Sequence, residues 1–124
     1  MAADELDAAI YVDAPDREAL LARVAEVTGG TRDGATVEAP GHALDVDAND
    51  EADPAAAAAF PDGFLHFAQR VEVYADAPPA TALVAALLEA FWAAGWPAVA
   101  ASDYEDELPH GGGYGVRPLP WPAG

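Results

Sequence analysis

Three oxygen-bearing side chains alternate in the stretch DVDAN at residues 45–49, with the spacing of the first ligands of a calcium-binding loop. The match ends there, because Asp50 stands where such a loop needs glycine and Ala56 stands where it needs glutamate. A β-strand explains the same spacing, since alternate residues of a strand share one face. We therefore predict a strand here and no metal site.

Other residues suited to catalysis or metal binding are few and scattered. The three histidines, His42, His66 and His110, are not at the spacing of metal ligands on a helix or hairpin. Ser102 is the only serine and has no nucleophile motif around it. The glycine run 111–113 lacks the spacing and the following helix of a phosphate-binding loop. With no cysteine for thiolate chemistry either, the sequence favours a binding protein over an enzyme, with no catalytic residues and no cofactor.

Charge is the most unusual property of the sequence. The chain has 22 acidic residues, five arginines and no lysine, which gives a formal net charge of −17. Such a charge disfavours nucleic acid and anionic membranes as partners, because both attract basic residues. A GC-rich genome or adaptation to salt would also produce an acidic, alanine-rich and lysine-free chain. The functional interpretation is a basic partner protein.

The densest periodic apolar pattern lies in residues 64–102 and predicts a strand, a helix and a second strand. Alternation over residues 64–76 is typical of a strand with one buried face. The residues expected on that face are Leu65, Phe67, Val71 and Val73, with Gln69 as a polar interruption. One helical stripe is expected to contain Leu83, Val84, Leu87, Phe91 and Ala94, and Gly95 should end this helix.

The first half of the chain predicts a strand at residues 8–14, then a helix that Asp13 caps and Gly29 ends. One further strand is expected at residues 43–48, with a possible start at 36–39 that Pro40-Gly41 interrupts as a turn or bulge. The order strand, helix, strand, strand, helix, strand is that of an α+β, ferredoxin-like split βαβ fold. It predicts a four-stranded antiparallel sheet with both helices on one face. Residues 1–110 should form this single domain, followed by a Gly- and Pro-rich tail at 111–124.

The sheet face that the helices leave open is where we expect function. Its alternating positions are Tyr11, Asp13, Asp45, Asp47, His66, Arg70, Glu72 and Tyr74. To these we add Asp103, Tyr104 and Glu105 from the acidic cluster after the last strand. This surface predicts an acidic partner of a basic protein, such as an inhibitor or immunity protein, in which charge steers association and tyrosines supply contact area. The alternative is a small-molecule or catalytic pocket between the sheet face and the tail, walled by Trp92, Trp96, Tyr114 or Trp121.

The stretch PAVAASDYEDELP at residues 97–109 resembles small uncharacterised proteins of high-GC actinobacteria. The resemblance concerns the second half of the chain and implies no activity. Residues 1–9 lack the basic and apolar regions of a signal peptide, and no apolar run approaches ~18 residues. We expect a cytoplasmic protein that is a monomer or a weak dimer, because pairing two open faces would bring like charges together.

The excess of acidic residues generates a prediction about salt. Repulsion among the carboxylates should destabilise the folded state more than the expanded unfolded chain. Sodium chloride screens that repulsion, so the melting temperature should rise between low salt and about 0.5 M. A melt series measures this, and a flat response would mean that the acids are spaced or paired well enough not to strain the fold. Stabilisation by micromolar calcium but not by sodium would contradict our rejection of a calcium site at residues 45–49.

Overall fold

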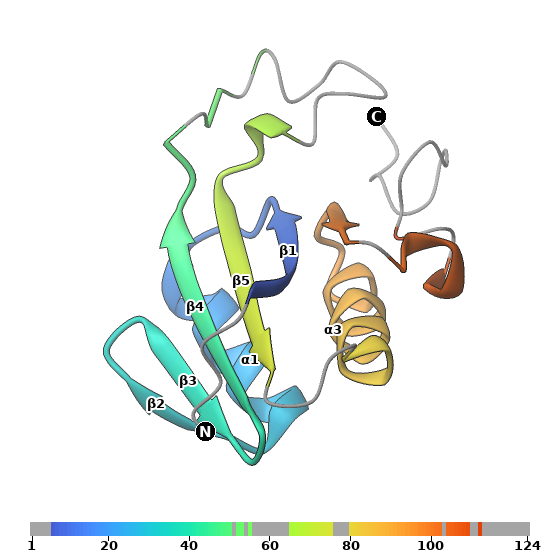
Figure 1. Cartoon of the computed structure of the whole chain (residues 1–124). Coiled ribbons are helices and arrows are strands. Elements are labelled where there is room, and N and C mark those ends of the chain that lie inside the picture. The colour runs from blue at the N-terminus through green and yellow to red at the C-terminus, as the bar shows by residue number, and fades with distance from the viewer. Residues whose placement is uncertain are drawn as a thin grey trace.

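The computed structural model of the protein describes residues 6–50, 52–53, 55, 65–75, 80–102, 104–109 and 112. Within these residues, six strands form one open antiparallel sheet, and two α-helices cover one of its faces (Figure 1). The predicted α+β class is confirmed. The expected number of four strands is wrong, because a further pair of strands widens the sheet at one edge.

The strands are β1 (Leu6–Val12), β2 (Thr31–Asp33), β3 (Thr36–Ala39), β4 (His42–Ala48), β5 (Gln69–Ala75) and β6 (Ala98–Ala101). Across the sheet they lie in the order β2-β3-β4-β5-β1-β6. The helices are α1 (Arg17–Thr28) and α3 (Thr81–Ala93), and a short 3₁₀ helix, η2, follows β6 at Glu105–Glu107. Helix α1 packs on β2, β3 and β4, whereas α3 packs on β1 and β6, so the two helices divide the sheet between them.

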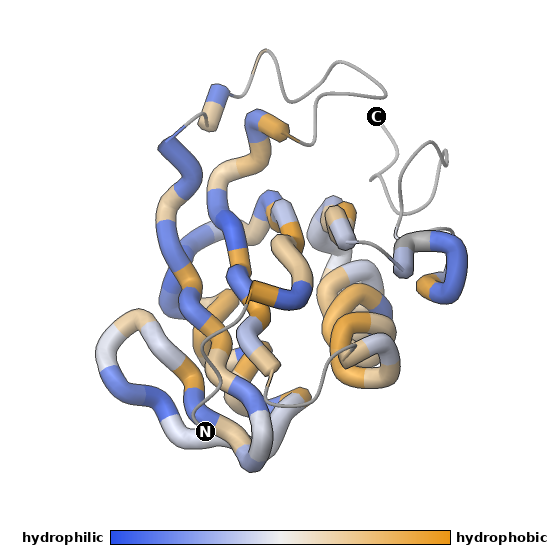
Figure 2. Tube along the Cα trace, in the orientation of Figure 1, coloured by the Kyte–Doolittle hydropathy of each residue, from blue (hydrophilic) through white to orange (hydrophobic). Residues whose placement is uncertain are grey.

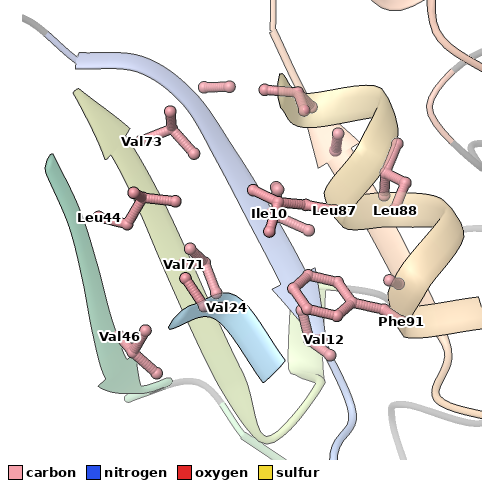
Figure 3. Packing of buried hydrophobic residues seen from close by; sticks show 14 of the residues in the cluster. Ile10, Val12, Val24, Leu44, Val46, Val71, Val73, Leu87, Leu88 and Phe91 are labelled. Carbon is pink, nitrogen blue, oxygen red and sulfur yellow. The ribbon is translucent and has the colours of Figure 1, made fainter. Parts of the chain in front are cut away.

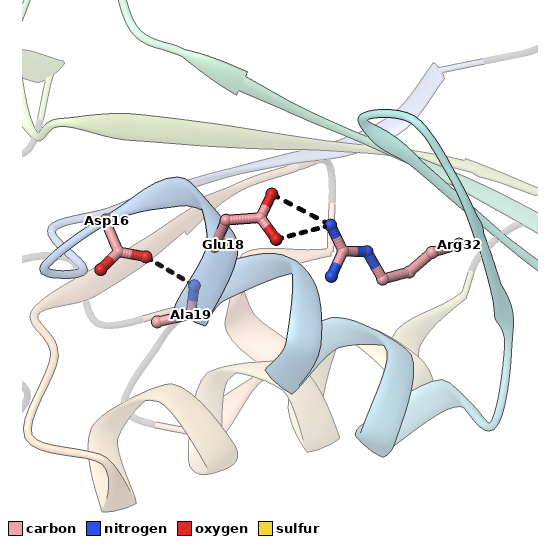
Figure 4. A network of polar contacts seen from close by, with 4 residues as sticks. All are labelled: Asp16, Glu18, Ala19 and Arg32. Atoms are coloured by element: carbon pink, nitrogen blue, oxygen red, sulfur yellow. Dashed lines mark hydrogen bonds and ion pairs between the residues drawn. The ribbon is translucent and has the colours of Figure 1, made fainter.

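Strand β2, and the separation of β3 from β4, are the parts of the sheet that the sequence pattern did not predict. All three residues of β2 are exposed, so this strand has no apolar alternation to reveal it. The signal that was present is Gly34, the first residue of the two-residue turn Gly34-Ala35, where one type of hairpin turn requires glycine. Gly34 has a φ of 64°, which glycine adopts without steric cost. Arg32 of β2 donates to both carboxylate oxygens of Glu18 in α1, at 2.9 and 3.0 Å (Figure 4).

The N-cap of helix α1 lies three residues later than predicted. Asp16, rather than Asp13, is the N-cap, and its carboxylate accepts a hydrogen bond from the backbone N–H of Ala19 at 2.7 Å (Figure 4). Asp13 directly follows β1, and its backbone N–H donates to O of Pro97, the residue before β6, at 2.9 Å. The predicted helix ends are confirmed, since Gly29 is the C-cap of α1 and Gly95, with a φ of 83°, follows the C-cap of α3.

The core lies between the sheet and the two helices. Alternate residues of the central strands point into it and meet the apolar stripes of both helices (Figure 3). Its largest members from the helices are Leu20, Leu21, Val24, Val84, Leu87, Leu88 and Phe91. Figure 2 shows the same pattern as a mostly hydrophobic α3 beside strands whose residues alternate in hydropathy. The helical stripe differs from the prediction in two positions, because Leu88 is buried and Ala94 is exposed.

The central strand β5 begins at Gln69, five residues after the start predicted for it. Asn49 explains the difference, because its amide N–H₂ group donates to Leu65 O at 2.9 Å and to Phe67 O at 2.8 Å. These bonds hold the segment before β5 in a turn instead of a strand ladder. Leu65 is therefore 42% exposed, which contradicts its predicted burial. Phe67 is buried as expected, but in a second cluster with Val99, against which Tyr11 packs.

Gln69 is the one buried polar residue of the described part of the chain, with 6% of its surface exposed. Its side-chain oxygen accepts from Ala14 N at 2.9 Å, and its amide nitrogen donates to Ala14 O at 3.2 Å. The side chain thus satisfies both backbone groups of a residue just past the end of β1. An unpaired backbone group at this depth would cost about 1–3 kcal/mol.

Only Gly112 of the predicted tail is among the described residues. It is buried with a φ of 80°, and a Cβ atom at this position would lie 2.9 Å from Ala100 O of β6. Real Cβ atoms essentially never approach another atom so closely. The backbone at this glycine therefore packs against the sheet edge, and residues 113–124 lie outside the described part.

Leu87 provides a test of the core. It is fully buried in the middle of the α3 stripe, so Leu87→Ala should lower the free energy of unfolding by about 2–5 kcal/mol. Urea denaturation measures this loss. The exposed residue Glu89 on the same helix is the control, and Glu89→Ala should change stability by less than about 0.5 kcal/mol. A loss below about half a kcal/mol for Leu87→Ala would contradict the packing of this helix face.

Candidate functional site

The sheet face opposite the helices carries most of the predicted site residues in adjacent rows. Strand register aligns Asp47 of β4 with Arg70 of β5, and Arg70 with Tyr11 of β1. The next row pairs Asp45 with Glu72. Tyr74 lies one row further along β5, opposite Ala43. Paired residues of neighbouring strands point to the same side of a sheet, so these side chains share one surface.

The β2–β3 hairpin extends this surface and adds acidic residues to it. Asp33 pairs with Thr36, and Thr36 pairs with Asp45, so the row of Asp45 continues to the sheet edge. Glu38 pairs with Ala43 and joins the row of Tyr74. We call the combined surface the open acidic face, and define it by Tyr11, Asp33, Glu38, Asp45, Asp47, Arg70, Glu72 and Tyr74.

A network of polar contacts occupies the centre of the open acidic face. Arg70 forms an ion pair with Glu72 at 2.6 Å and a side-chain hydrogen bond with Tyr11. Burial alone would lower the pKa of Arg70, but the hydrogen bond with Tyr11 and the charge of Glu72 raise it above its usual value. Burial, followed by the charges of Glu72 and Asp45, raises the pKa of Tyr74. The tyrosine therefore stays neutral, and its hydroxyl donates to Glu72 at 3.4 Å.

The acids nearer the β2 edge have no cationic partner among the described residues. Asp45 accepts a hydrogen bond from the Thr36 hydroxyl at 2.7 Å, which orients its carboxylate without neutralising its charge. Asp33, Glu38 and Asp47 are exposed and form no ion pair in the described part of the chain. This half of the face therefore presents uncompensated negative charge.

Three further predicted site residues, Asp13, His66 and Tyr104, lie outside the strand pairs that define the open acidic face. Asp13 is exposed and accepts from Ala68 N at 3.2 Å, and His66 lies in the turn before β5. Asp103 is outside the described residues, as is the side chain of Glu105, whose backbone forms η2. Tyr104 is only 8% exposed, so it offers a partner little contact area.

Tyr104 instead belongs to a structural contact that sequence reasoning missed. Its hydroxyl donates to the Asp7 carboxylate at 2.5 Å, and the same carboxylate oxygen accepts from Ala80 N at 2.9 Å. Ala80 is the N-cap position of α3 and has no capping side chain of its own. Asp7 therefore caps α3 from β1, where the strand register shifts between Leu6 and Ala8. Nothing in the local sequence connects residues 7, 80 and 104, so only the fold reveals this contact.

Two hollows border the described surface. The larger, about 580 Å³, lies at the end of the sheet and is lined by Arg17, Asp47, Ala48, Asn49, Asp50 and Arg70. The second, about 370 Å³, lies on the helical side between α1 and α3 and includes Trp96. The alternative pocket predicted from sequence lies between the sheet face and the tail and is walled by Trp92, Trp96, Tyr114 or Trp121. Trp92 donates to Ala98 O at 3.0 Å and packs on the core, whereas Tyr114 and Trp121 lie outside the described residues.

Searches against protein-family models, curated proteins and solved structures found no match. The resemblance to actinobacterial proteins therefore stays a prediction. In the residues that the structure describes, no helix has the length and apolar character needed to cross a membrane. The same residues contain no group of three or more histidine, aspartate or glutamate side chains placed to hold a metal ion.

The buried tyrosine generates a prediction about alkaline pH. Burial, with the hydrogen bond to Asp7 and the charge of Asp7, raises the pKa of Tyr104 well above its usual range. Because the folded-state pKa is raised, the stabilisation is fully present below the unfolded-state pKa of about 10 and is lost as pH rises beyond it. Above pH ~10 the free energy of unfolding should fall by about 1.4 kcal/mol per pH unit more in the wild type than in Tyr104→Phe. Denaturation curves from pH 8 to 11 for both proteins measure this, and parallel pH profiles would contradict it.

Proposed function

We propose that this protein is an acidic binding protein that docks a basic protein on its open acidic face, in the manner of an inhibitor or immunity protein. The observation that carries the proposal is a group of uncompensated carboxylates on β2, β3 and β4, spread over three neighbouring rows of the open acidic face. Asp33, Glu38 and Asp47 are exposed and unpaired in the described residues, whereas Arg70, the cation of this face, is already bound to Glu72. A partner that supplies arginine or lysine side chains would neutralise these carboxylates.

The two parts of the face suit different aspects of binding. The unpaired acids at the β2 edge would speed association, because complementary charge raises encounter rates and sets orientation more than it adds affinity. Tyr11 and Tyr74 lie further towards the sheet centre and are partly exposed. Aromatic residues are enriched in protein interfaces because they bury large areas and keep a polar group available. Arg70 and Glu72 connect the two tyrosines. Arg70 forms a hydrogen bond with Tyr11 and an ion pair with Glu72, and Glu72 accepts a hydrogen bond from Tyr74.

The proposal also includes a finer description of the fold. We infer a ferredoxin-like core made of β4, β5, β1 and β6, to which the β2–β3 hairpin is an addition at one edge. The spatial order of these four strands and their antiparallel pairing support this. So does the sequence order, in which α1 lies between β1 and β4, and α3 lies between β5 and β6. The hairpin then has a functional consequence, because it widens the acidic surface.

Two matched double variants test the proposed function. Asp33→Asn with Glu38→Gln removes two exposed charges from the open acidic face, and Glu26→Gln with Glu89→Gln removes two from exposed positions on the helices. Each protein is immobilised and exposed to lysate, and basic proteins that elute between about 0.1 and 0.5 M salt are quantified. The wild type and the helix variant should retain the same basic protein. The face variant should bind it roughly 2- to 30-fold more weakly, because each exposed charge pair contributes about 0.2–1 kcal/mol.

Amide chemical shifts then locate the binding surface. Titration of the labelled protein with the captured partner should perturb β3, β4 and β5 and leave the exposed side of α3 unchanged. Equal weakening by the face and helix variants would show that only net charge matters. That outcome, or perturbations confined to the helices, would overturn the proposal.

A further inference from the structure

The larger hollow lies where three segments meet at one end of the sheet. Arg17 is the first residue of α1, Asp47 and Ala48 end β4, and Asn49 and Asp50 follow them. Arg70, from the start of β5, completes the lining. Its volume of about 580 Å³ falls within the ~300–1,000 Å³ range of small-molecule sites. We refer to this hollow as the sheet-end pocket.

Arg17 is unusual among the arginines of this protein. In the described part of the chain, Arg23 pairs with Glu26 and Arg32 with Glu18, both at 2.9 Å, and Arg70 pairs with Glu72 at 2.6 Å. The Arg17 side chain forms no hydrogen bond or ion pair with any described residue. Acids outnumber arginines by 22 to five, so an arginine without an acidic partner is unexpected on charge statistics alone.

The acids of the sheet-end pocket are unpaired as well. Asp47 and Asp50 are exposed, and their carboxylates form no ion pair or hydrogen bond in the described residues. The pocket therefore holds charges of both signs that do not satisfy one another. A simple anion would meet two carboxylates there, and a simple cation would meet two guanidinium groups. A molecule that carries both charges would satisfy both sets.

Other contacts of the pocket are already fixed. The Asn49 side-chain amide donates to Leu65 O and Phe67 O, and its backbone N–H donates to Ala68 O at 2.9 Å. Arg70 is held by Glu72 and Tyr11, yet a guanidinium group has five N–H donors and these two contacts do not use all of them. Asn49 and the guanidinium group of Arg70 are thus held in position before any ligand binds, which lowers the entropy cost of binding.

We propose that the sheet-end pocket binds a free α-amino acid. Its carboxylate would accept hydrogen bonds from Arg17 and Arg70, since guanidinium groups match carboxylates in geometry and charge. Its ammonium group would donate to Asp47 and Asp50. This inference goes beyond the proposed function, because the pocket is bordered by Arg17 and Asp50, which are not part of the open acidic face.

The test is a titration of the labelled protein with each of the common L-amino acids, followed by amide chemical shifts. At least one should perturb the amides of Arg17, Asn49 and Arg70. The N-acetyl and carboxamide derivatives of that amino acid each lack one charge and should bind at least tenfold more weakly. The proposal is wrong if no amino acid perturbs these amides at about 10 mM. At this concentration a site with a dissociation constant of about 1 mM would be almost fully occupied. Equal binding of either derivative would also overturn it.

Two arginine variants separate the pocket from net charge. Arg17→Gln removes a guanidinium group that forms no hydrogen bond or ion pair within the described residues, so the fold should be retained. It should weaken amino-acid binding by about tenfold or more, because hydrogen bonds to charged groups contribute about 1.5–3 kcal/mol. Arg32→Gln makes the same charge change outside the pocket and should leave the affinity unchanged. Equal losses in the two variants would contradict the site, and capture of a basic protein should be unaffected by Arg17→Gln.

Discussion

The bond between the Gln69 side chain and the backbone of Ala14 is the constraint on which much of this structure depends. Both partners are buried, and each would leave unpaired polar groups without the other. The contact fixes where β1 stops and the chain turns towards α1. It therefore sets the position of Asp16, which caps the helix, and of Arg17, which borders the sheet-end pocket. A single buried amide links the central strand to both the helix start and the candidate ligand site.

The two faces of the sheet differ in chemistry because alternate residues of each strand point to opposite sides. Alternation sends Val71 and Val73 of β5 into the core and sends Arg70, Glu72 and Tyr74 to the opposite face. On the covered face, burial of apolar area stabilises the fold by about 25 cal/mol per Å². On the open face no helix covers the side chains, so carboxylates such as Asp33, Glu38 and Asp47 stay exposed to water there. The apolar core and the proposed recognition surface thus lie on opposite sides of the same strands.

Periodic apolar residues made the α+β class, both helices and the central strands predictable from sequence. The open face was predictable for the same reason, because a strand's buried alternate positions define its exposed ones. Contacts between distant polar groups were not predictable. Asn49 holds the turn before β5, and Asp7 binds Tyr104 and caps α3, but neither contact leaves a periodic signal. The strand β2 was missed because its three exposed residues carry no apolar pattern, although Gly34 is suited to the first position of its turn.

Both borders of the sheet limit intermolecular strand pairing. An edge strand with free backbone groups is a template on which another chain can add, and this route leads to fibrillar aggregation. At one border, β2 offers only three residues, two of them the charged Arg32 and Asp33. At the other, the close approach of Gly112 to Ala100 O places this chain's own backbone beside β6, at a distance that leaves no room even for a methyl group. A protein rich in alanine and valine is in this way guarded against self-templated assembly at the two places where its sheet is open.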